Sequence, residues 1–223
     1  MNEDINAARP DEHRSLRADA ERNRQRIVEA ARAVFAGRGL DAPLDAIAER
    51  AGVGQATLYR RFPRREDLIV ACFEPKLAEY AAAVEDALRA ADPWEGFRAF
   101  VERICGMQAV DVCVQEVLTT TFPAARAVEA QRAHAYEQIK AVIQRAQDQG
   151  SLRADFVAED IVLLLFANAG VVGAMRTTAP DAWRRFVGLM LEGFRADRAT
   201  PLPPPPTPAQ AYRAMRRVGR GNL

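Results

Sequence analysis

The short segment Gln55–Phe62 carries the side chains with the clearest chemistry in the chain. If it forms a helix at about 100° per residue, Leu58 and the following Phe62 point inward, and their neighbours point outward. The outward groups are an amide, a methyl, a hydroxyl, a phenol and guanidinium groups, which can meet base edges and phosphates in the major groove of DNA. These residues are Gln55, Ala56, Thr57, Tyr59, Arg60 and Arg61.

The flanking sequence is suited to hold this segment in place. Apolar residues recur at helical spacing from Leu44 to Ala51, which predicts a short helix with one apolar face. Gly52 follows at the position of a helix C-cap that needs a positive φ. Pro63 is expected to end the second helix, because it cannot donate the next backbone hydrogen bond. The pattern is that of a helix-turn-helix.

Positive charge is concentrated around the helix-turn-helix. The whole chain has a formal net charge of +1, but between Arg14 and Arg65 twelve arginines face six acidic residues. Phosphate neutralisation is the main non-specific source of affinity for DNA. Arg64 and Arg65 crowd the same short stretch as Arg60 and Arg61, so we expect them to contact phosphates too.

One stretch resembles the DNA-binding signature of the TetR family of bacterial transcriptional regulators: AERAGVGQATLYRRFPRREDLI, with the pattern A-G-V-x-x-x-T-L-Y-x-x-F. The resemblance extends upstream through RNRQRIVEAARAVFAGRGLDAPLDAIA and covers roughly residues 20–70. It implies that the start of the first long helix, predicted over Asp19–Ala36, approaches the phosphate backbone. Arg22 and Arg26 lie one turn apart at that start and are candidates for further DNA contacts, with a solvated charged face as the alternative.

The expected fold class is all-α, with an N-terminal three-helix helix-turn-helix domain and a C-terminal helical domain for ligand binding and dimerisation. Helical periodicity continues to Arg198. The predicted boundaries are a disordered arm over residues 1–17, the DNA-binding domain over 18–65 and the helical domain over 66–198. A Pro-rich basic tail over 199–223 is predicted to be disordered.

The helical body is expected to hold a small-molecule effector. Apolar walls with a few polar groups are typical of ligand sites, although aromatic stripes at helical spacing are also typical of a core. Asn168 stands out, because an amide in an apolar helix must find a partner, either a ligand or the opposite helix across the dimer. The expected effector residues are Phe97, Phe100, Ile104, Met107, Cys113, Val117, Phe122, His134, Phe166 and Asn168.

The last helical pair carries more apolar surface than one chain can easily bury. The segment Ile161–Met175 is apolar almost all round, and Trp183–Phe194 has an unbroken apolar stripe. The simplest way to cover both is a two-fold homodimer in which the pair meets its own copy as a four-helix bundle. Two DNA-binding heads would then read a near-palindromic operator in double-stranded DNA. The expected function is transcriptional regulation, as a repressor released by a small ligand.

Two alternatives remain open at this point. The first is a redox-responsive regulator that uses Cys105 or Cys113, although buried inert thiols fit the apolar surroundings better. The second is a DNA-binding protein that needs no ligand and has a well-packed body.

An enzyme is not expected, because the chain contains no HxxxH, CxxC, G-x-S-x-G, P-loop or G-x-G-x-x-G sequence. No cofactor or metal is expected either. The longest apolar run, Ile161–Met175, is shorter than a membrane span. We therefore expect a cytoplasmic protein that does not associate with membranes.

Overall fold

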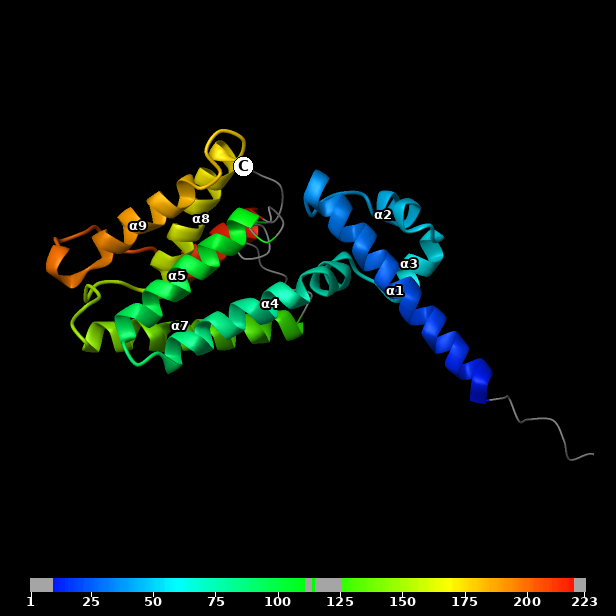
Figure 1. Ribbon diagram of the computed structural model, residues 1–223, viewed down its shortest axis with the longest axis horizontal. Coiled ribbons are helices and arrows are strands. Elements are labelled where there is room, and N and C mark those ends of the chain that lie inside the picture. Colours follow the sequence, from blue (N-terminus) through cyan, green and yellow to red (C-terminus); the bar gives the residue numbers. More distant parts are fainter. Residues whose placement is uncertain (1–9, 111–113, 115–125, 219–223) are drawn as a thin grey trace, which may run out of the picture. The chain divides into compact units, whose positions relative to one another are not determined.

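The computed structural model describes residues 10–110, 114 and 126–218. The backbone of these residues is helical, and an isolated antiparallel bridge between Leu152 and Arg195 is its only β pairing. The described chain divides into two units. The first contains residues up to Arg38 and Ala42–Cys72, and the second contains Gly39–Asp41 and the chain from Phe73 onward. The expected all-α class is confirmed (Figure 1).

The N-terminal unit is built on one long helix and two short ones. Helix α1 (Pro10–Arg38) packs against α2 (Leu44–Ala51), and α3 (Gln55–Arg61) follows after a tight turn. The apolar residues of these helices and of the segment that follows α3 form a small core in which the largest side chains are almost inaccessible to solvent. That core contains Ile27, Ala31, Phe35, Ile47, Leu58, Phe62 and Leu68.

Helix α4 (Arg65–Arg89) belongs to both units. Its first two turns bury Leu68, Ile69 and Cys72, and the N-terminal unit extends to Cys72. The division between the units therefore falls inside α4, between Cys72 and Phe73. The predicted boundary lies after residue 65, at the start of this helix. The helix runs on through Pro75.

The C-terminal unit is a bundle of packed helices. Its core is a continuous cluster of buried apolar side chains that includes Phe97, Phe100, Ile104 and Trp183. Phe156 joins this cluster with its ring edge-on to Phe97, at 5.3 Å between centroids. Besides the second half of α4, the bundle contains α5 (Pro93–Val110), α7 (Arg126–Asp148), α8 (Ala158–Met175) and α9 (Ala182–Phe194).

Two arginines brace the ends of these helices by donating to main-chain carbonyls. Arg145 on α7 contacts the carbonyl oxygens of Leu88 and Ala90 at the C-terminal end of α4. Arg153 is buried and donates to the carbonyl oxygen of Thr200 at 2.7 Å. Cations at helix C-termini satisfy carbonyls that have no partner within the helix. The chain after α9 is thereby held to the connection between α7 and α8.

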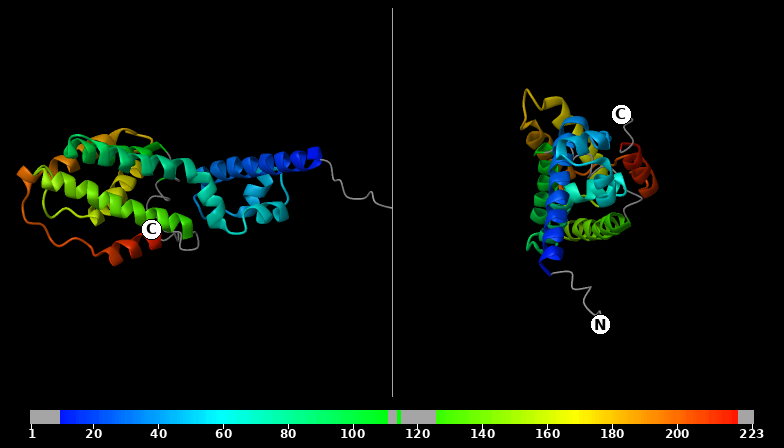
Figure 2. Two further views of the ribbon diagram at one scale, coloured as in Figure 1. Left: turned by 90° about the horizontal axis from the view of Figure 1, so that it is seen from below. Right: turned by 90° about the vertical axis from the view of Figure 1, so that its right-hand side faces the viewer.

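Both ends of the chain contain more helix than expected. Helix α1 begins at Pro10, inside the arm predicted to be disordered. In the tail, a short 3₁₀ turn (Ala196–Arg198) and a proline-rich segment lead to α10 (Pro208–Val218), the red helix in Figure 2. Helix α10 contacts α8. The tail forms a helix because Thr207 and Gln210 make a reciprocal capping box, in which the Thr207 N–H donates to Gln210 Oε1 at 2.8 Å.

Candidate DNA-binding surface and effector site

The turn between α2 and α3 has the geometry that the sequence predicts. Gly52 has a φ of +62°, the left-handed conformation that glycine adopts at little cost. Its N–H donates to the carbonyl oxygen of Glu49, and the Val53 N–H donates to that of Ala48, each at 3.0 Å. The positive-φ cap at Gly52 is therefore confirmed. Helix α3 ends at Arg61 with Phe62 as its C-cap, one residue before the proline.

Helix α3 exposes the polar face that was expected to read DNA. Leu58 and Phe62 are buried, and Tyr59 is 47% exposed although it lies beside Leu58 in sequence. Arg60 donates from Nη2 to the Thr57 hydroxyl at 3.3 Å, so these two side chains lie on one side of the helix. Of the remaining residues of the expected face, Gln55, Ala56 and Arg61 are exposed.

The other expected phosphate contacts differ in their surroundings. Arg64 is exposed and forms a two-pronged contact with Asp67, and these hydrogen bonds raise the pKa of Arg64 and lower that of Asp67. Arg65 is half-buried and donates to the carbonyl oxygen of Ala42 at 2.6 Å. Arg22 is exposed and paired with Asp19 on the same face of α1. Arg64 and Arg22 are therefore accessible to phosphate, whereas Arg65 also holds the loop before α2.

Arg26 is a positioning residue whose role the sequence did not reveal. Its Nη2 donates to the carbonyl oxygens of Ala51 at 2.6 Å and Gly52 at 3.4 Å, across the C-terminal end of α2. From its position along α1, Arg26 looks like a surface arginine. Its contact with Ala51 is 25 residues away in sequence and leaves no pattern among the neighbouring residues. The structure shows that Arg26 caps the helix that supports α3.

The expected effector residues fall into three groups. Three of them, Cys113, Val117 and Phe122, lie outside the described residues. His134 is exposed, which argues against it as an inward polar group, and Phe166 is half-buried. The others are enclosed in the core of the C-terminal unit: Phe97, Phe100, Ile104, Met107 and Asn168.

Two amides lie together in this core between α5 and α8. Gln108 and Asn168 are fully buried, and Asn168 Nδ2 donates to Gln108 Oε1 at 2.9 Å. Asn168 Nδ2 also donates to the carbonyl oxygen of Cys105, and Gln108 Nε2 donates to that of Leu165. The Nδ2 group of Asn168 thus finds both of its partners within its own chain, and not on a helix across a dimer.

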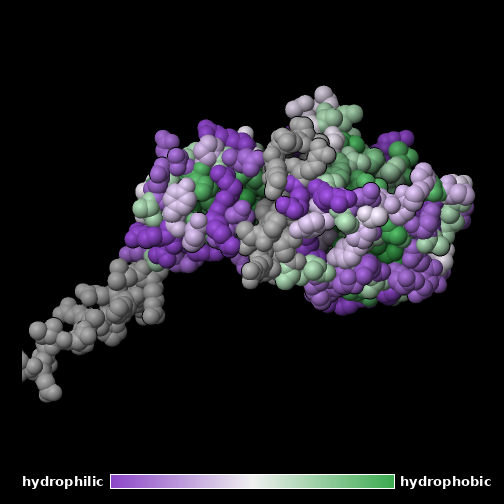
Figure 3. Space-filling view, turned by 180° about the vertical axis from the view of Figure 1, so that it is seen from behind, coloured by the Kyte–Doolittle hydropathy of each residue, from purple (hydrophilic) through white to green (hydrophobic). Residues whose placement is uncertain are grey.

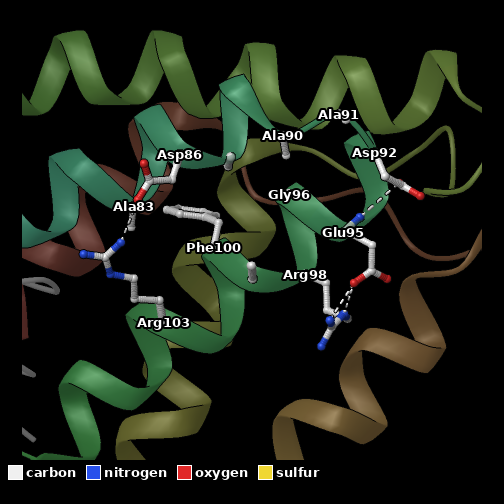
Figure 4. A pocket seen from close by; sticks show the side chains of 12 residues that line it. Ala83, Asp86, Ala90, Ala91, Asp92, Glu95, Gly96, Arg98, Phe100 and Arg103 are labelled. Carbon is white, nitrogen blue, oxygen red and sulfur yellow. Dashed lines mark hydrogen bonds and ion pairs between the residues drawn. The ribbon is translucent and has the colours of Figure 1, made fainter.

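A hollow of about 410 Å³ lies elsewhere, on the surface where α4 meets the start of α5 (Figure 4). Its lining combines small residues such as Ala83 and Gly96 with charged ones, including the Asp86–Arg103 ion pair at 3.0 Å. Among the described residues that line it, only Phe100 is an expected effector residue. The hollow is therefore not the site that the sequence predicted.

Comparison with known proteins supplies the family. The profile described as "Bacterial regulatory proteins, tetR family" matches residues 27–72, and the one described as "Transcriptional regulator SbtR-like, C-terminal domain" matches residues 92–196. A TetR transcriptional regulator from Streptomyces coelicolor is 31% identical, with 77% of this chain and 98% of that chain covered and a TM-score of 0.47. The chain belongs to the TetR family of bacterial transcriptional regulators.

Other members of the family show the same relationship. A TetR regulatory protein from Mycobacterium vanbaalenii is 30% identical, with 81% of this chain and 99% of that chain covered and a TM-score of 0.48. The regulator FadR from Bacillus subtilis, solved with stearoyl-CoA, is 16% identical, with 79% and 99% covered and a TM-score of 0.60. The last likeness concerns the fold alone. No curated protein sequence matches the chain.

Regulators of the TetR family bind DNA as dimers, and the last helices of this chain leave apolar surface uncovered. Leu163 on α8 is 50% exposed and Leu189 on α9 is 56% exposed. Beside them, a Cβ added at Gly170 or Gly188 would meet no atom within 4 Å. Figure 3 shows apolar patches on the C-terminal unit, whereas hydrophilic side chains cover much of the N-terminal unit.

Helix α8 begins three residues before the apolar run Ile161–Met175, and its 18 residues are long and apolar enough to cross a membrane by length and composition alone. Core helices of soluble proteins share these properties, and TetR-family regulators are soluble cytoplasmic proteins. In the part of the chain that the structure describes, no group of three or more His, Cys, Asp or Glu residues is arranged to hold a metal ion.

Two of the cysteines are described, and both are buried. Burial raises the pKa of Cys72 and of Cys105 to about 12. A thiol is reactive as the thiolate, so neither has the environment of a redox switch. Cys113 lies outside the described residues.

Proposed function

We propose that this TetR-family regulator is a repressor that binds a palindromic operator as a homodimer and leaves it when a small apolar molecule binds the helical body. The observation that carries the proposal is the exposed face of α3. Tyr59 and Arg60 project from a helix whose opposite side is anchored by buried Leu58. A rigid helix with exposed amide, phenol and guanidinium groups is the element that family members insert into the major groove.

In this proposal the residues divide between base reading and phosphate contact. Gln55, Thr57, Tyr59 and Arg60 lie on one helix and offer donors and acceptors to base edges, with Ala56 as an apolar contact for thymine. Phosphate contacts carry no sequence information but fix the register of the protein on DNA. They are assigned to Arg61, Arg64, Arg65 and Arg22.

The dimer is assigned to α8 and α9 of two copies. Exposed Leu163 and Leu189 would be covered there, and the open space at Gly170 and Gly188 would admit close helix approach. Dimerisation couples two heads, so the operator is expected to be a near-palindrome with half-sites about one helical turn apart or a multiple of it.

Release requires an effector that binds two conformations differently, because a ligand with equal affinity for both shifts no equilibrium. The apolar core around Phe97, Phe100 and Ile104, with a buried amide pair beside it, supports an apolar or amphipathic effector. The FadR relative was solved with stearoyl-CoA, an amphipathic molecule, which is in keeping with that class.

The test begins with genomic fragments retained by the purified protein at near-physiological salt and identified by sequencing. Enrichment of one palindrome supports the proposal, and retention without a shared motif that vanishes as salt rises contradicts it. Arg60→Ala and Tyr59→Phe should then lose specific binding while light scattering still reports a dimer. Arg89→Ala is the matched control, because Arg89 is also exposed but lies at the far end of α4.

A further inference from the structure

Helices α5 and α8, which lie side by side in the C-terminal unit (Figure 1), bury two amide side chains against each other. Gln108 and Asn168 are both 0% exposed, and the residues that flank them on these helices, including Ile104, Leu164 and Val172, are buried and apolar. Burying an amide without partners costs free energy, so its hydrogen bonds can be counted atom by atom.

The orientation of both amides is fixed by two main-chain carbonyls. Gln108 lies 3.3 Å from the carbonyl oxygen of Leu165, and Asn168 lies 3.1 Å from that of Cys105. A carbonyl oxygen can only accept, so the atoms facing these carbonyls must be Gln108 Nε2 and Asn168 Nδ2. Gln108 Oε1 then accepts from Asn168 Nδ2 at 2.9 Å. Flipping either amide would place two acceptors against each other.

This arrangement leaves one acceptor over. Within the described residues, Asn168 Oδ1 is buried and has no hydrogen-bond partner. Such groups are rare in folded proteins, and each calls for an explanation. We infer that Asn168 Oδ1 is the anchor of the effector site and accepts a hydrogen bond from a neutral hydroxyl or N–H of the bound molecule. This inference rests on the proposed effector-controlled function and names the chemical class of the effector.

The surroundings select a neutral donor. The pair sits among buried apolar side chains, and the Cys105 thiol stays protonated because burial raises its pKa to about 12. A cation placed there would lose its hydration, whereas a hydroxyl would lose one bond to water and regain it from Asn168. A donor attached to an apolar body, such as an alkylphenol or a fatty alcohol, matches both the acceptor and its walls.

The experiment uses pairs of probes that differ only in the donor. Calorimetry on the full-length protein compares 4-propylphenol with 4-propylanisole, and 1-naphthol with 1-methoxynaphthalene. Loss of one buried hydrogen bond weakens binding about tenfold, so each hydroxyl compound should bind about tenfold more tightly than its methyl ether. Equal affinity within both pairs, or no binding of either hydroxyl compound, overturns the inference.

Substitutions test whether the preference for the hydroxyl compounds depends on Asn168. Asn168→Leu should reduce the tenfold preference to about one. Val172→Ala, a neighbouring substitution that removes only apolar contact, should lower the melting temperature and keep the preference. If Asn168→Leu does not fold, the double variant Gln108→Leu and Asn168→Leu replaces the whole pair by apolar side chains of similar size. A preference that survives in these variants contradicts the assignment.

A measurement on the unaltered protein gives an independent readout. The side-chain amide resonance of Asn168 should shift on binding 4-propylphenol and shift much less with 4-propylanisole. Operator binding is recorded in parallel with the same compounds. If the hydroxyl compounds bind at Asn168 more tightly than their methyl ethers but do not release the operator, the proposed effector control is refuted and the proposed binding site stands. If the hydroxyl compounds and their methyl ethers bind equally well and both release the operator, the binding site at Asn168 is refuted and the proposed effector control stands.

Discussion

Arg26 on α1 lies across the C-terminal end of α2, where its Nη2 donates to the carbonyl oxygen of Ala51 at 2.6 Å. Four carbonyls at such an end have no partner within the helix and carry partial negative charge. One guanidinium therefore ties the long helix to the support of α3. The turn that aims the DNA-reading face is held by a residue outside the helix-turn-helix.

Arg26→Met should lower the free energy of unfolding by about 1 kcal/mol, since it removes a charged hydrogen-bond donor from partly exposed carbonyls. Operator affinity should fall as well, because α3 is less firmly held. Arg22→Met is the matched control, because Arg22 is exposed and pairs with nearby Asp19 on the same helix. It should weaken DNA binding with little effect on urea unfolding. Similar unfolding curves for the two variants would refute the capping role.

The glycines near the turn make a second test. Gly52 has a φ of +62°, and an added Cβ would lie 2.8 Å from Arg26 Nη2. Gly52→Ala should therefore cost about 1–2 kcal/mol through the left-handed backbone alone. Gly37 lies in the last turn of α1 with nothing within 4 Å of an added Cβ, so Gly37→Ala should stabilise, by up to about 0.5 kcal/mol. Thermal unfolding of both variants checks the opposite signs.

The sequence predicted those features of the fold that depend on residues close together in the chain. The cap at Gly52, the inward Leu58 and the amphipathic helices follow from backbone sterics and apolar spacing, which are written in neighbouring residues. The ends were harder, since polar composition alone suggested disorder at both. The capping pair Thr207 and Gln210 was a readable signal of α10 that composition obscured.

Contacts between distant residues could not be predicted. Arg26, Arg145 and Arg153 reach carbonyls 25, 55 and 47 residues away, and nothing in their neighbourhood distinguishes them from surface arginines. Asn168 was recognisable as an amide that needs a partner, but its pairing with Gln108 depends on how α5 meets α8. The sequence could therefore suggest which residues belong to the candidate effector site, but not how they contact one another.

Salt dependence should separate the phosphate contacts from the base contacts. Each phosphate neutralised by the protein contributes about −0.9 to the slope of log K against log salt concentration. Arg61→Ala should reduce the magnitude of that slope by about one unit for operator and for unrelated DNA alike. Tyr59→Phe removes no charge and should leave the slope unchanged while it weakens operator binding. Fluorescence anisotropy between 50 and 200 mM salt, about the range over which such slopes are read, makes this comparison.

The connection after α7 should respond to acid through Asp155. Arg153 donates to Asp155 through Nε at 2.5 Å and Nη2 at 2.9 Å, and these bonds hold the pKa of Asp155 below its ordinary value. A lowered pKa in the folded state adds stability above the ordinary carboxyl pKa of about 4, and this stability is lost as the pH falls through the folded value. Asp155→Asn removes that contribution. Urea unfolding should separate the variant from the wild type at pH 6, and the difference should shrink as the pH falls below about 4. A constant difference would contradict the role.

Thiol labelling tests the buried cysteines. Burial raises the pKa of Cys72 and Cys105 to about 12, so at pH 8 fewer than about one thiol in a thousand is ionised and both are shielded from reagent. In a Cys113→Ser variant, which retains only these two thiols, Ellman's reagent should therefore show no fast reaction while the protein is folded. Both thiols should react at once in urea, which confirms that they are reduced and counts them. A fast thiol in the folded variant would mean that local opening exposes α4 or α5, and it would return a cysteine switch to consideration.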